Sequence, residues 1–200
     1  MRQNIISGAF PAGAPLKQED LAARFGISMG SLREALRTLH SDGLVKIMPN
    51  RGAQVTDLSA EEAEEIFDIR SFLELGALEL ALPNLTEKDF TAAEKILGKM
   101  DNAKDSSKWA ELNREFHDAL YRPAGRPRLL SMLGNLHDNV GRYLRLYLDT
   151  LNFQSESQSE HYALIKACRQ NELPLAKKIL RKHLIDAREK LAAYLTARNR

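Results

Sequence analysis

Residues 28–40 constrain the fold most, because they form one amphipathic helix with two distinct faces. Ser28 is placed to cap the start of this helix. The apolar face follows the i, i+3, i+4, i+7 spacing and consists of Leu32, Ala35, Leu36 and Leu39. The opposite face carries Met29, Arg33 and Arg37, which are four residues apart. Such a helix buries one side and offers a basic side to a partner.

The residues around this helix predict a helix-turn-helix followed by a hairpin. Leu16–Phe25 has the pattern of a second short helix, and Gly26 suits a tight turn between the two. An ordinary helical hairpin would look similar, because two amphipathic helices around a glycine are common. Leu44–Met48 and Ala53–Thr56 then resemble two strands joined by the turn residues Pro49–Gly52. A hairpin in this position favours a winged helix, whose second helix enters a DNA major groove.

Charge also points to DNA. Residues 1–55 carry a net charge of +3 and the remainder −1, within +2 for the whole chain. The basic excess therefore lies with the predicted DNA reader, as phosphate binding requires. Arg51 at the wing tip suits a side chain that reaches a minor groove or a phosphate, and the alternative is a solvated turn residue. Because so small an excess binds DNA weakly, we expect a dimer that doubles the contact.

Other features exclude several protein classes. No apolar run approaches the roughly 18–20 residues that a membrane span needs, and the start of the chain has no signal-peptide apolar region. The single cysteine, Cys168, cannot form an internal disulfide, which fits the reducing cytoplasm. Its apolar helical neighbours predict a buried structural thiol. We therefore expect a cytoplasmic protein with no membrane partner.

The chain changes character after residue 57. Ser59–Glu62 is a capping box, and almost only helical periodicity follows it. The expected helices cover residues 60–82, 87–101, 107–121, 127–150, 157–170 and 173–197. Six helices with short loops predict an antiparallel bundle. The predicted fold is therefore mainly α, with a winged helix-turn-helix domain in residues 1–57 and an all-helical domain in residues 58–200.

Residues 5–55 resemble the DNA-binding domain of the GntR family of bacterial transcription regulators. The matching motifs occur in order and are S-G-x-x-x-x-G, L-A-x-x-x-G-[IV]-S, L-R-E-A-L-x-x-L, G-L-V and N-R-G-A-x-V. In that family the start of the second helix, its arginine and the wing tip touch DNA. The resemblance assigns this role to Ser28, Met29, Gly30, Ser31, Arg33, Arg51 and Gly52.

Two of these positions depart from the family pattern. The family usually has arginine where this chain has Met29, and often proline or threonine where it has Ser31. An arginine that reads guanine contributes ~1–3 kcal/mol of discrimination. The resemblance thus implies an operator that differs from the family's commonest site, or a lower affinity.

The second half resembles the FCD-type ligand-binding domain of the FadR subfamily. The motifs are I-x-x-x-R-x-x-x-E at Ile66–Glu74, L-N-R-E-F-H at Leu112–His117, E-H-x-x-L-I-x-A at Glu160–Ala167 and A-x-x-x-L-x-x-H at Ala176–His183. Each helical motif is loose by itself. Their order after a winged helix is what makes the match specific, and the two resemblances cover residues 3–195.

Four residues of this half are candidate metal ligands. Asn113 and His117 are four residues apart on one helical face, and facing helices of a bundle can bring His161 and His183 to them. Imidazoles suit zinc, nickel, iron or copper, although three histidines in a chain are more often ordinary core or surface residues. In the resembled family one aspartate and three histidines bind a divalent metal, whose shell a carboxylate effector often completes. Since Asn113 replaces that aspartate, we expect weaker binding or another metal, with zinc or nickel first.

Arg70 is a candidate for effector binding. It lies one helical turn before Glu74, so it either forms a surface ion pair of little consequence or turns inward to grip an effector carboxylate. Some relatives of the resembled family use this arginine for an organic acid. His137 lies on a helix near the predicted site but matches no ligand position of the family, so it is not assigned.

Together these patterns predict a DNA-binding transcription regulator and not an enzyme. A homodimer would bind a pseudo-palindromic operator, and a small carboxylate in the metal-containing bundle would relieve repression by shifting the populations of the dimer. In one alternative, the metal itself is the signal. In another, the metal turns over a substrate, but no carboxylate near the motifs is fixed as its general base.

Overall fold

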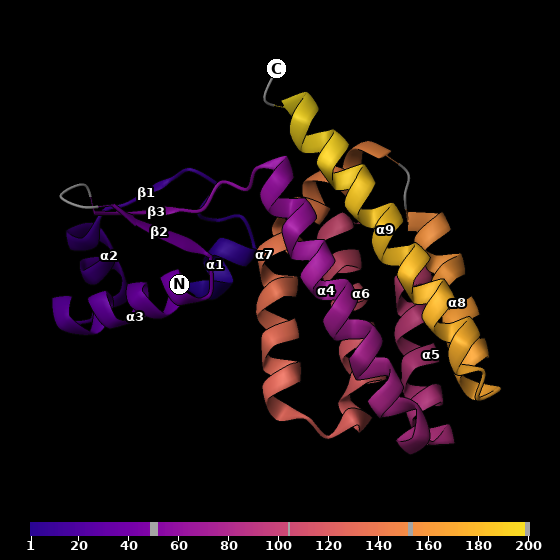
Figure 1. The fold of residues 1–200 in the computed structure, drawn as a ribbon. Coiled ribbons are helices and arrows are strands. Elements are labelled where there is room, and N and C mark those ends of the chain that lie inside the picture. The colour runs from indigo at the N-terminus through magenta and orange to yellow at the C-terminus, as the bar shows by residue number, and fades with distance from the viewer. Residues whose placement is uncertain (49–51, 104, 152–153, 199–200) are drawn as a thin grey trace. The chain divides into compact units, whose positions relative to one another are not determined.

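The computed structural model describes residues 1–48, 52–103, 105–151 and 154–198, without the side chains of residues 142 and 144–151. The chain divides into two compact units, Met1–Leu58 and Ser59–Arg200. The first combines short helices with a small sheet, and the second is a helical bundle (Figure 1). The predicted fold class is confirmed.

The N-terminal unit is a winged helix-turn-helix. Its helices are α1 (Arg2–Ile6), α2 (Gln18–Phe25) and α3 (Met29–Ser41). Its strands are β1 (Pro15–Leu16), β2 (Val45–Met48) and β3 (Gly52–Val55). The strand order is β1-β3-β2, and β3 pairs antiparallel with both neighbours. The predicted wing turn, residues 49–51, lies outside the described residues.

Local chemistry sets the helix-turn-helix. Gly26 ends α2 in the left-handed conformation, at φ +62°, which lets the chain reverse before α3. The side chain of Ser28 then caps α3 by accepting a hydrogen bond from the Ser31 backbone N–H at 3.1 Å. The predicted apolar face of α3 packs into one core with the other elements of the unit, including Ile5, Leu32, Leu36, Leu39, Leu44 and Val55.

The predicted start of the second helix is wrong by two residues. Leu16 was expected in that helix, but it lies in β1 opposite Ala53, and α2 starts at Gln18. A strand of two residues has too few positions for an alternating pattern. Strand β1 is recognised only by its pairing with β3, which the sequence does not show.

The C-terminal unit holds six α-helices in its described residues. They are α4 (Ala60–Ala81), α5 (Glu87–Asp101), α6 (Ser106–Tyr121), α7 (Pro127–Leu151), α8 (Gln154–Arg169) and α9 (Leu173–Arg198). Single 3-10 turns, η1 (Leu82–Asn84) and η2 (Arg122–Ala124), follow α4 and α6. Most helix bounds match the prediction within one residue, but α8 begins three residues earlier than expected.

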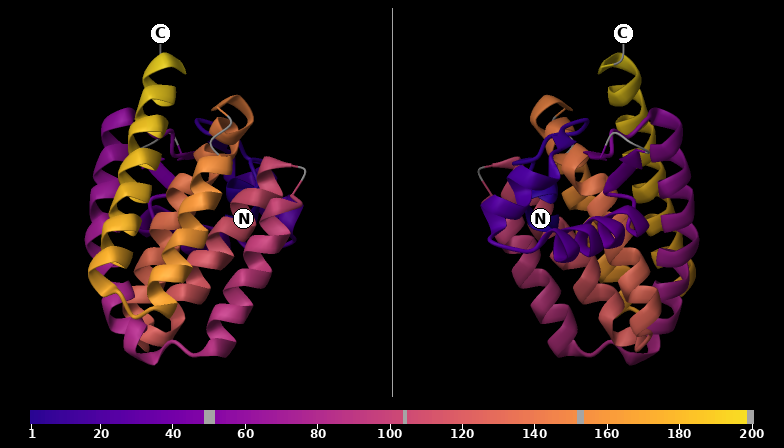
Figure 2. Two further views of the ribbon diagram at one scale, coloured as in Figure 1. Left: turned by 90° about the vertical axis from the view of Figure 1, so that its right-hand side faces the viewer. Right: turned by 90° about the vertical axis from the view of Figure 1, so that its left-hand side faces the viewer.

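The packing of these helices brings distant parts of the sequence together. The first helix, α4, packs against α6, α7 and α9, while α5 packs against α6 and α8. Helices α8 and α9 lie side by side, and the views of the bundle agree on this (Figure 2). Among the helices that the structure describes, none is both long enough and apolar enough to cross a membrane.

Candidate DNA interface and candidate metal centre

The exposed side of α3 carries most of the predicted DNA contacts. Four of them are exposed, namely Ser28, Gly30, Ser31 and Arg33, and Met29 is half-buried. Arg37 is paired with Glu34, with 2.8 Å between Nη1 and Oε1. By contrast, Arg33 has no carboxylate partner within the described part of the chain. A guanidinium that is exposed and unpaired is available for phosphate or base contacts.

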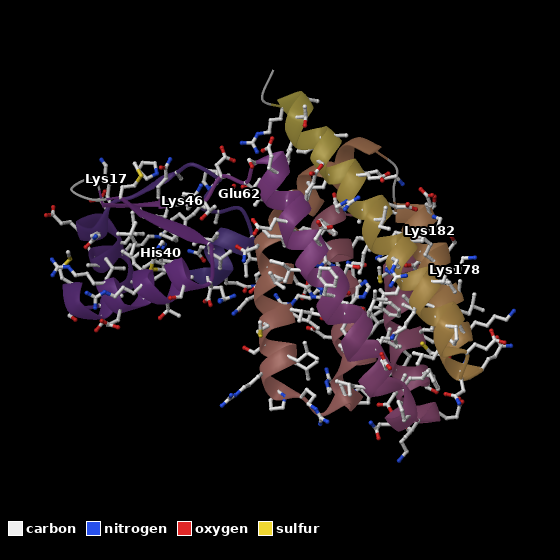
Figure 3. All side chains as sticks on the ribbon, viewed as in Figure 1. Lys17, His40, Lys46, Glu62, Lys178 and Lys182 are labelled. Atoms are coloured by element: carbon white, nitrogen blue, oxygen red, sulfur yellow. The ribbon has the colours of Figure 1, made fainter. Side chains whose placement is uncertain are left out.

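The base of the wing lies close to the start of α3. Met29 and Gly52 line one open pocket together with Lys17 and residues of β1 and α2. Figure 3 shows Lys17 and Lys46 near the strands of this unit, and Lys46 belongs to β2. The structure thus joins two predicted DNA contacts in one surface. The predicted contact at Arg51 lies outside the described residues.

Three histidines converge inside the bundle. His117 comes from α6, His161 from α8 and His183 from α9, and one ring nitrogen of each lies within 4.8 Å of the others. Their residues are 1%, 1% and 5% exposed. We call these residues the histidine cluster. The prediction that facing helices bring them together agrees with this arrangement, while their role as metal ligands stays a prediction.

The outer nitrogen of His183 faces a carboxylate. Its Nδ1 lies 3.0 Å from Oε2 of Glu160, whose Oε1 accepts a hydrogen bond from Lys182 at 2.6 Å. Lys182 lies along α9 in Figure 3. Burial works to raise the pKa of the Glu160 carboxyl, but the hydrogen bonds from His183 and Lys182 outweigh it and lower the pKa. An ionised carboxylate only accepts, so Nδ1 of His183 carries the proton and its Nε2 is the free nitrogen.

The outer nitrogen of His161 faces an amide oxygen. Its Nδ1 lies 3.4 Å from Oε1 of Gln158. The amide nitrogen of Gln158 donates to the backbone carbonyl of Leu97 and to Oδ1 of Asp101, both at 2.9 Å. Both N–H groups are thereby used, which fixes the orientation of the amide. His161 therefore donates through Nδ1, and Nε2 is again the free nitrogen.

A buried carboxylate, Glu74 of α4, lies at the centre of a second group of side chains. Its Oε1 accepts from Arg70 Nε at 2.9 Å and from His137 Nε2 at 3.0 Å. Its Oε2 accepts from the hydroxyl of Tyr121 at 2.7 Å, and Nδ1 of His117 lies 3.2 Å from that hydroxyl. Burial works to raise the pKa of the Glu74 carboxyl, but Arg70 and His137 outweigh it and hold the pKa well below its usual value.

One of the two interpretations of Arg70 is wrong. The pair with Glu74 has the expected i, i+4 spacing, but it is not on the surface, because the two side chains are 5% and 0% exposed. The guanidinium also lies over the ring of Phe67, with its carbon 4.5 Å from the ring centroid. Arg70 therefore turns inward, and breaking such a buried pair would be strongly destabilising. The effector contact predicted for Arg70 stays a prediction.

The histidine cluster fits a divalent metal. Within the described residues, Nε2 of His117, Nε2 of His161 and Oδ1 of Asn113 are buried and have no hydrogen-bond partner. Burial lowers the pKa of His117 and of His161 well below the usual value, which keeps both rings neutral. Neutral imidazoles whose other nitrogen is held by an outer partner are the usual ligands of zinc and related metals.

Sequence reasoning did not find the outer partners of this cluster. Glu74 and Glu160 occur in the quoted motifs, but those motifs indicated no role for them toward the histidines, and His137 was not assigned. Tyr121 and Gln158 were not named either, although each lies one helical turn from a histidine of the cluster. Their other contacts, with Glu74 and Leu97, are 47 and 61 positions away and have no signal in the sequence. Helical spacing shows which residues share a face, but it does not show which face of another helix they meet.

The fold and the cluster together define a class of protein, a winged-helix DNA-binding domain joined to a helical bundle with a buried histidine site. Comparison with known families gives the assignment within this class. Residues 1–55 match the bacterial regulatory proteins of the gntR family, and residues 65–186 match the FCD domain. The chain belongs to the GntR family, with an FCD domain as its second half. This confirms the family predicted from the sequence and the prediction that the chain is not an enzyme.

Individual relatives agree with this assignment. The chain is 30% identical to the uncharacterized HTH-type transcriptional regulator YdhC of Bacillus subtilis, over 80% of this chain and 71% of that protein. It is 28% identical to the HTH-type transcriptional repressor GlaR of Escherichia coli, over 92% and 89%. The solved structure of E. coli McbR/YncC has a TM-score of 0.83 at 25% identity, covering 96% of this chain and 93% of that one.

Proposed function

We propose that the protein is a homodimeric repressor whose operator binding is controlled by a small organic acid at a metal site in its FCD domain. The observation that carries this proposal is the convergence of His117, His161 and His183. Two of their Nε2 atoms are buried without a partner among the described residues. A buried polar atom of this kind costs about 1–3 kcal/mol, so the arrangement is best explained by a ligand that these atoms bind.

The ligand set favours zinc or nickel. His117, His161 and His183 would hold the metal through Nε2, with Oδ1 of Asn113 as an oxygen donor. When bound, the metal supplies a Lewis acid with coordination positions open to a carboxylate oxygen. Since Asn113 is neutral, the negative charge near the site comes from Glu160 and Glu74, which lie behind the histidines. We therefore expect weaker metal binding than with an aspartate at position 113.

In this proposal only the terminal nitrogens of Arg70 contact the effector. Its Nε is occupied by Glu74, so an effector carboxylate would meet the terminal nitrogens of the guanidinium. A fork of N–H donors matches a carboxylate well. Because Arg70 also holds the buried charge of Glu74, its replacement would affect folding as well as effector binding. The metal is therefore the better site to test first.

The DNA side of the proposal rests on α3 and the wing. Arg33 and the start of α3 would meet base edges in the major groove, while Gly52 and Arg51 would meet the minor groove or the backbone. Two copies would place their α3 helices about 34–36 Å apart, one helical turn of DNA. The name of GlaR, a transcriptional repressor, supports repression as the direction of control.

One side of α4 offers a surface for the second copy. Ile69, Leu73, Gly76 and Leu80 are spaced by four, three and four residues, the repeat of helices that pair along one seam. Ile69 and Leu80 are each 39% exposed, and the neighbouring Phe72 is 80% exposed. Large exposed apolar side chains of this kind are typical of protein interfaces. Sedimentation of the wild-type protein at micromolar concentration should therefore show a dimer.

Elemental analysis of the purified, unchelated protein tests the metal site. We expect about one zinc or nickel per chain. Thermal melts against a set of small carboxylates should then single out an acid that raises the melting temperature, since a ligand that binds only the folded state stabilises it. A protein that carries no metal and responds to no acid would contradict the proposed control and leave only the DNA-binding function.

Operator binding tests the direction of control. Selection from a random DNA library identifies the site without knowledge of the regulated genes, and fluorescence anisotropy then measures affinity with and without the acid. Allosteric couplings are typically about 5- to 150-fold, and we expect the acid to weaken binding. If chelation alone changes the affinity and no acid does, the metal itself is the signal.

A further inference from the structure

Tyr121 and Glu74 stand behind His117 in the bundle. We propose that they are positioning residues of the candidate metal site, which fix His117 as the Nδ1–H tautomer with Nε2 free to bind. The inference rests on the proposed metal function and adds the residues that set the direction of a chain of hydrogen bonds. Among the described residues, these two side chains link His117, the member of the histidine cluster on α6, to α4.

The argument begins with the single proton of Tyr121. The hydroxyl lies 2.7 Å from Oε2 of Glu74 and 3.2 Å from Nδ1 of His117, so it contacts two groups but can donate to only one. If it donates to Glu74, its oxygen accepts from Nδ1–H of His117. If it donates to His117, then Nδ1 is the acceptor and the proton of the ring lies on Nε2, which blocks metal binding. The tautomer of His117 thus depends on Glu74.

Glu74 selects the first arrangement. Its Oε1 already receives hydrogen bonds from Arg70 and His137. Two donors on one oxygen stabilise the ionised carboxylate, which has no proton to give. Since Oε2 can only accept, Tyr121 must donate to it, and His117 must donate to Tyr121.

Burial protects this arrangement of hydrogen bonds from water. Glu74, His117 and Tyr121 are at most 1% exposed, so bulk water does not compete for these hydrogen bonds. Tyr121 follows His117 by one helical turn, which places both on the same face of α6. The free Nε2 of His117 is the consequence, and it has no partner among the described residues.

The other two histidines are held directly. Glu160 accepts from His183, and Gln158, whose N–H groups are both used, accepts from His161. Only His117 is held through a hydroxyl group, which can reverse the direction in which it donates its proton. The tautomer of His117 is therefore the one that a change in the outer residues can invert.

Glu74→Gln should invert the tautomer of His117. The oxygen of the introduced amide would face the two donors, Arg70 and His137, and its NH2 group would face Tyr121. Tyr121 would then accept from the amide and donate to Nδ1 of His117, leaving the proton of the ring on Nε2. The exchange keeps the shape of the side chain and reverses the direction of the chain of hydrogen bonds.

Long-range 1H–15N correlation spectra of the histidine rings test this in the metal-free protein, because they distinguish the two tautomers. We expect Nδ1–H at His117 in the wild-type protein and Nε2–H in Glu74→Gln. A zinc titration against a competing chelator should show binding weakened about 10- to 100-fold, the usual effect of outer-partner changes. The matched control is Glu79→Gln, the same exchange on α4 at an exposed residue paired with Lys177, which should change neither result.

Tyr121→Phe keeps the proposal testable if Glu74→Gln fails to fold. It removes the hydroxyl without adding a donor, so we expect the preference for Nδ1–H to weaken and zinc affinity to fall about tenfold. An Nε2–H tautomer in the wild-type protein, or a folded Glu74→Gln protein that keeps Nδ1–H, would overturn the proposal. A wild-type protein with the Nδ1–H tautomer that binds no zinc would overturn the metal function instead, because the tautomer is read without metal.

Discussion

The N-terminal unit exposes most of its described candidate residues, whereas the bundle buries its three candidate histidines and Arg70. Ser28, Gly30, Ser31 and Arg33 lie on the solvent side of one helix. The histidine cluster is assembled from three helices, and Tyr121 connects it to Glu74 on a fourth. An exposed face on one helix is a local property that a motif describes well. A buried site depends on how helices meet, and a motif on one helix does not show which side chains of the other helices will meet it.

The largest expected effect comes from removing two of the proposed ligands of the candidate metal site. His161→Ala combined with His183→Ala takes away two of the three imidazoles, and we expect metal content to fall from about one per chain to none. Elemental analysis after gel filtration measures this. His40→Ala is the matched control, because His40 belongs to the N-terminal unit, where its Nδ1 contacts the Val45 carbonyl. Equal metal content in wild type and the double variant would end the metal-site proposal.

A cavity in the core of one unit should disrupt a different function from a cavity in the core of the other. Leu32 and Leu97 are both fully buried, Leu32 in the first unit and Leu97 in the bundle. Each leucine-to-alanine exchange should cost about 2–5 kcal/mol. A small unit such as the winged helix has little stability to lose. We expect Leu32→Ala to abolish operator binding and retain metal, and Leu97→Ala to lower the metal-dependent transition.

Leu32→Ala and Leu97→Ala are compared by calorimetry, and metal content and operator binding are measured on the same samples. Two separate transitions, each shifted by one of the variants, are the expected result. A single transition shifted equally by both variants would show that the units unfold together, and the comparison between them would then hold only for their sites.

On the exposed side the expected effects are smaller. Arg33→Ala removes a charge and five donors from the exposed side of α3, and it should weaken operator binding by about 1–3 kcal/mol. The reason is the loss of one base or phosphate contact per copy. Arg188→Ala serves as the control, because it removes the same charge from α9, where Arg188 pairs with Asp68. An Arg33→Ala protein that binds the selected operator as tightly as wild type would contradict the assignment of α3 as the reading helix.

Most of the fold was predictable because its signals are local. The capping box at Ser59 and Glu62 forms as expected, with bonds of 3.0 and 3.1 Å, and it starts α4 at the predicted residue. Proline at the first position of α7 likewise marks its start. The exceptions had weak local signals. The strand β1 has two residues, and α8 begins in the polar stretch after Phe153, where no apolar repeat indicates a helix.

The candidate site was predictable only in part. The four proposed ligands were named from their motifs, and the structure brings the three histidines together. Their outer partners were not named, because a hydrogen bond such as Tyr121 to Glu74 depends on the contact between α4 and α6. Arg70 shows the same limit. Its spacing to Glu74 was evident, but spacing does not distinguish a surface pair from a buried one.

The most subtle prediction concerns Asn113, the proposed ligand that departs from the pattern of the resembled family. Asn113→Asp places a carboxylate where Oδ1 of Asn113 is buried without a partner among the described residues. Opposite charge should tighten zinc binding on the order of tenfold, or about 1.4 kcal/mol. Without metal, the same charge is buried and unpaired, so the melting temperature of the metal-free protein should fall. Competition titrations and melts measure both, and Asn102→Asp at the exposed end of α5 is the control for zinc affinity. A fall in melting temperature without any gain in affinity would mean that Asn113 lies beside the metal site but does not contribute to it.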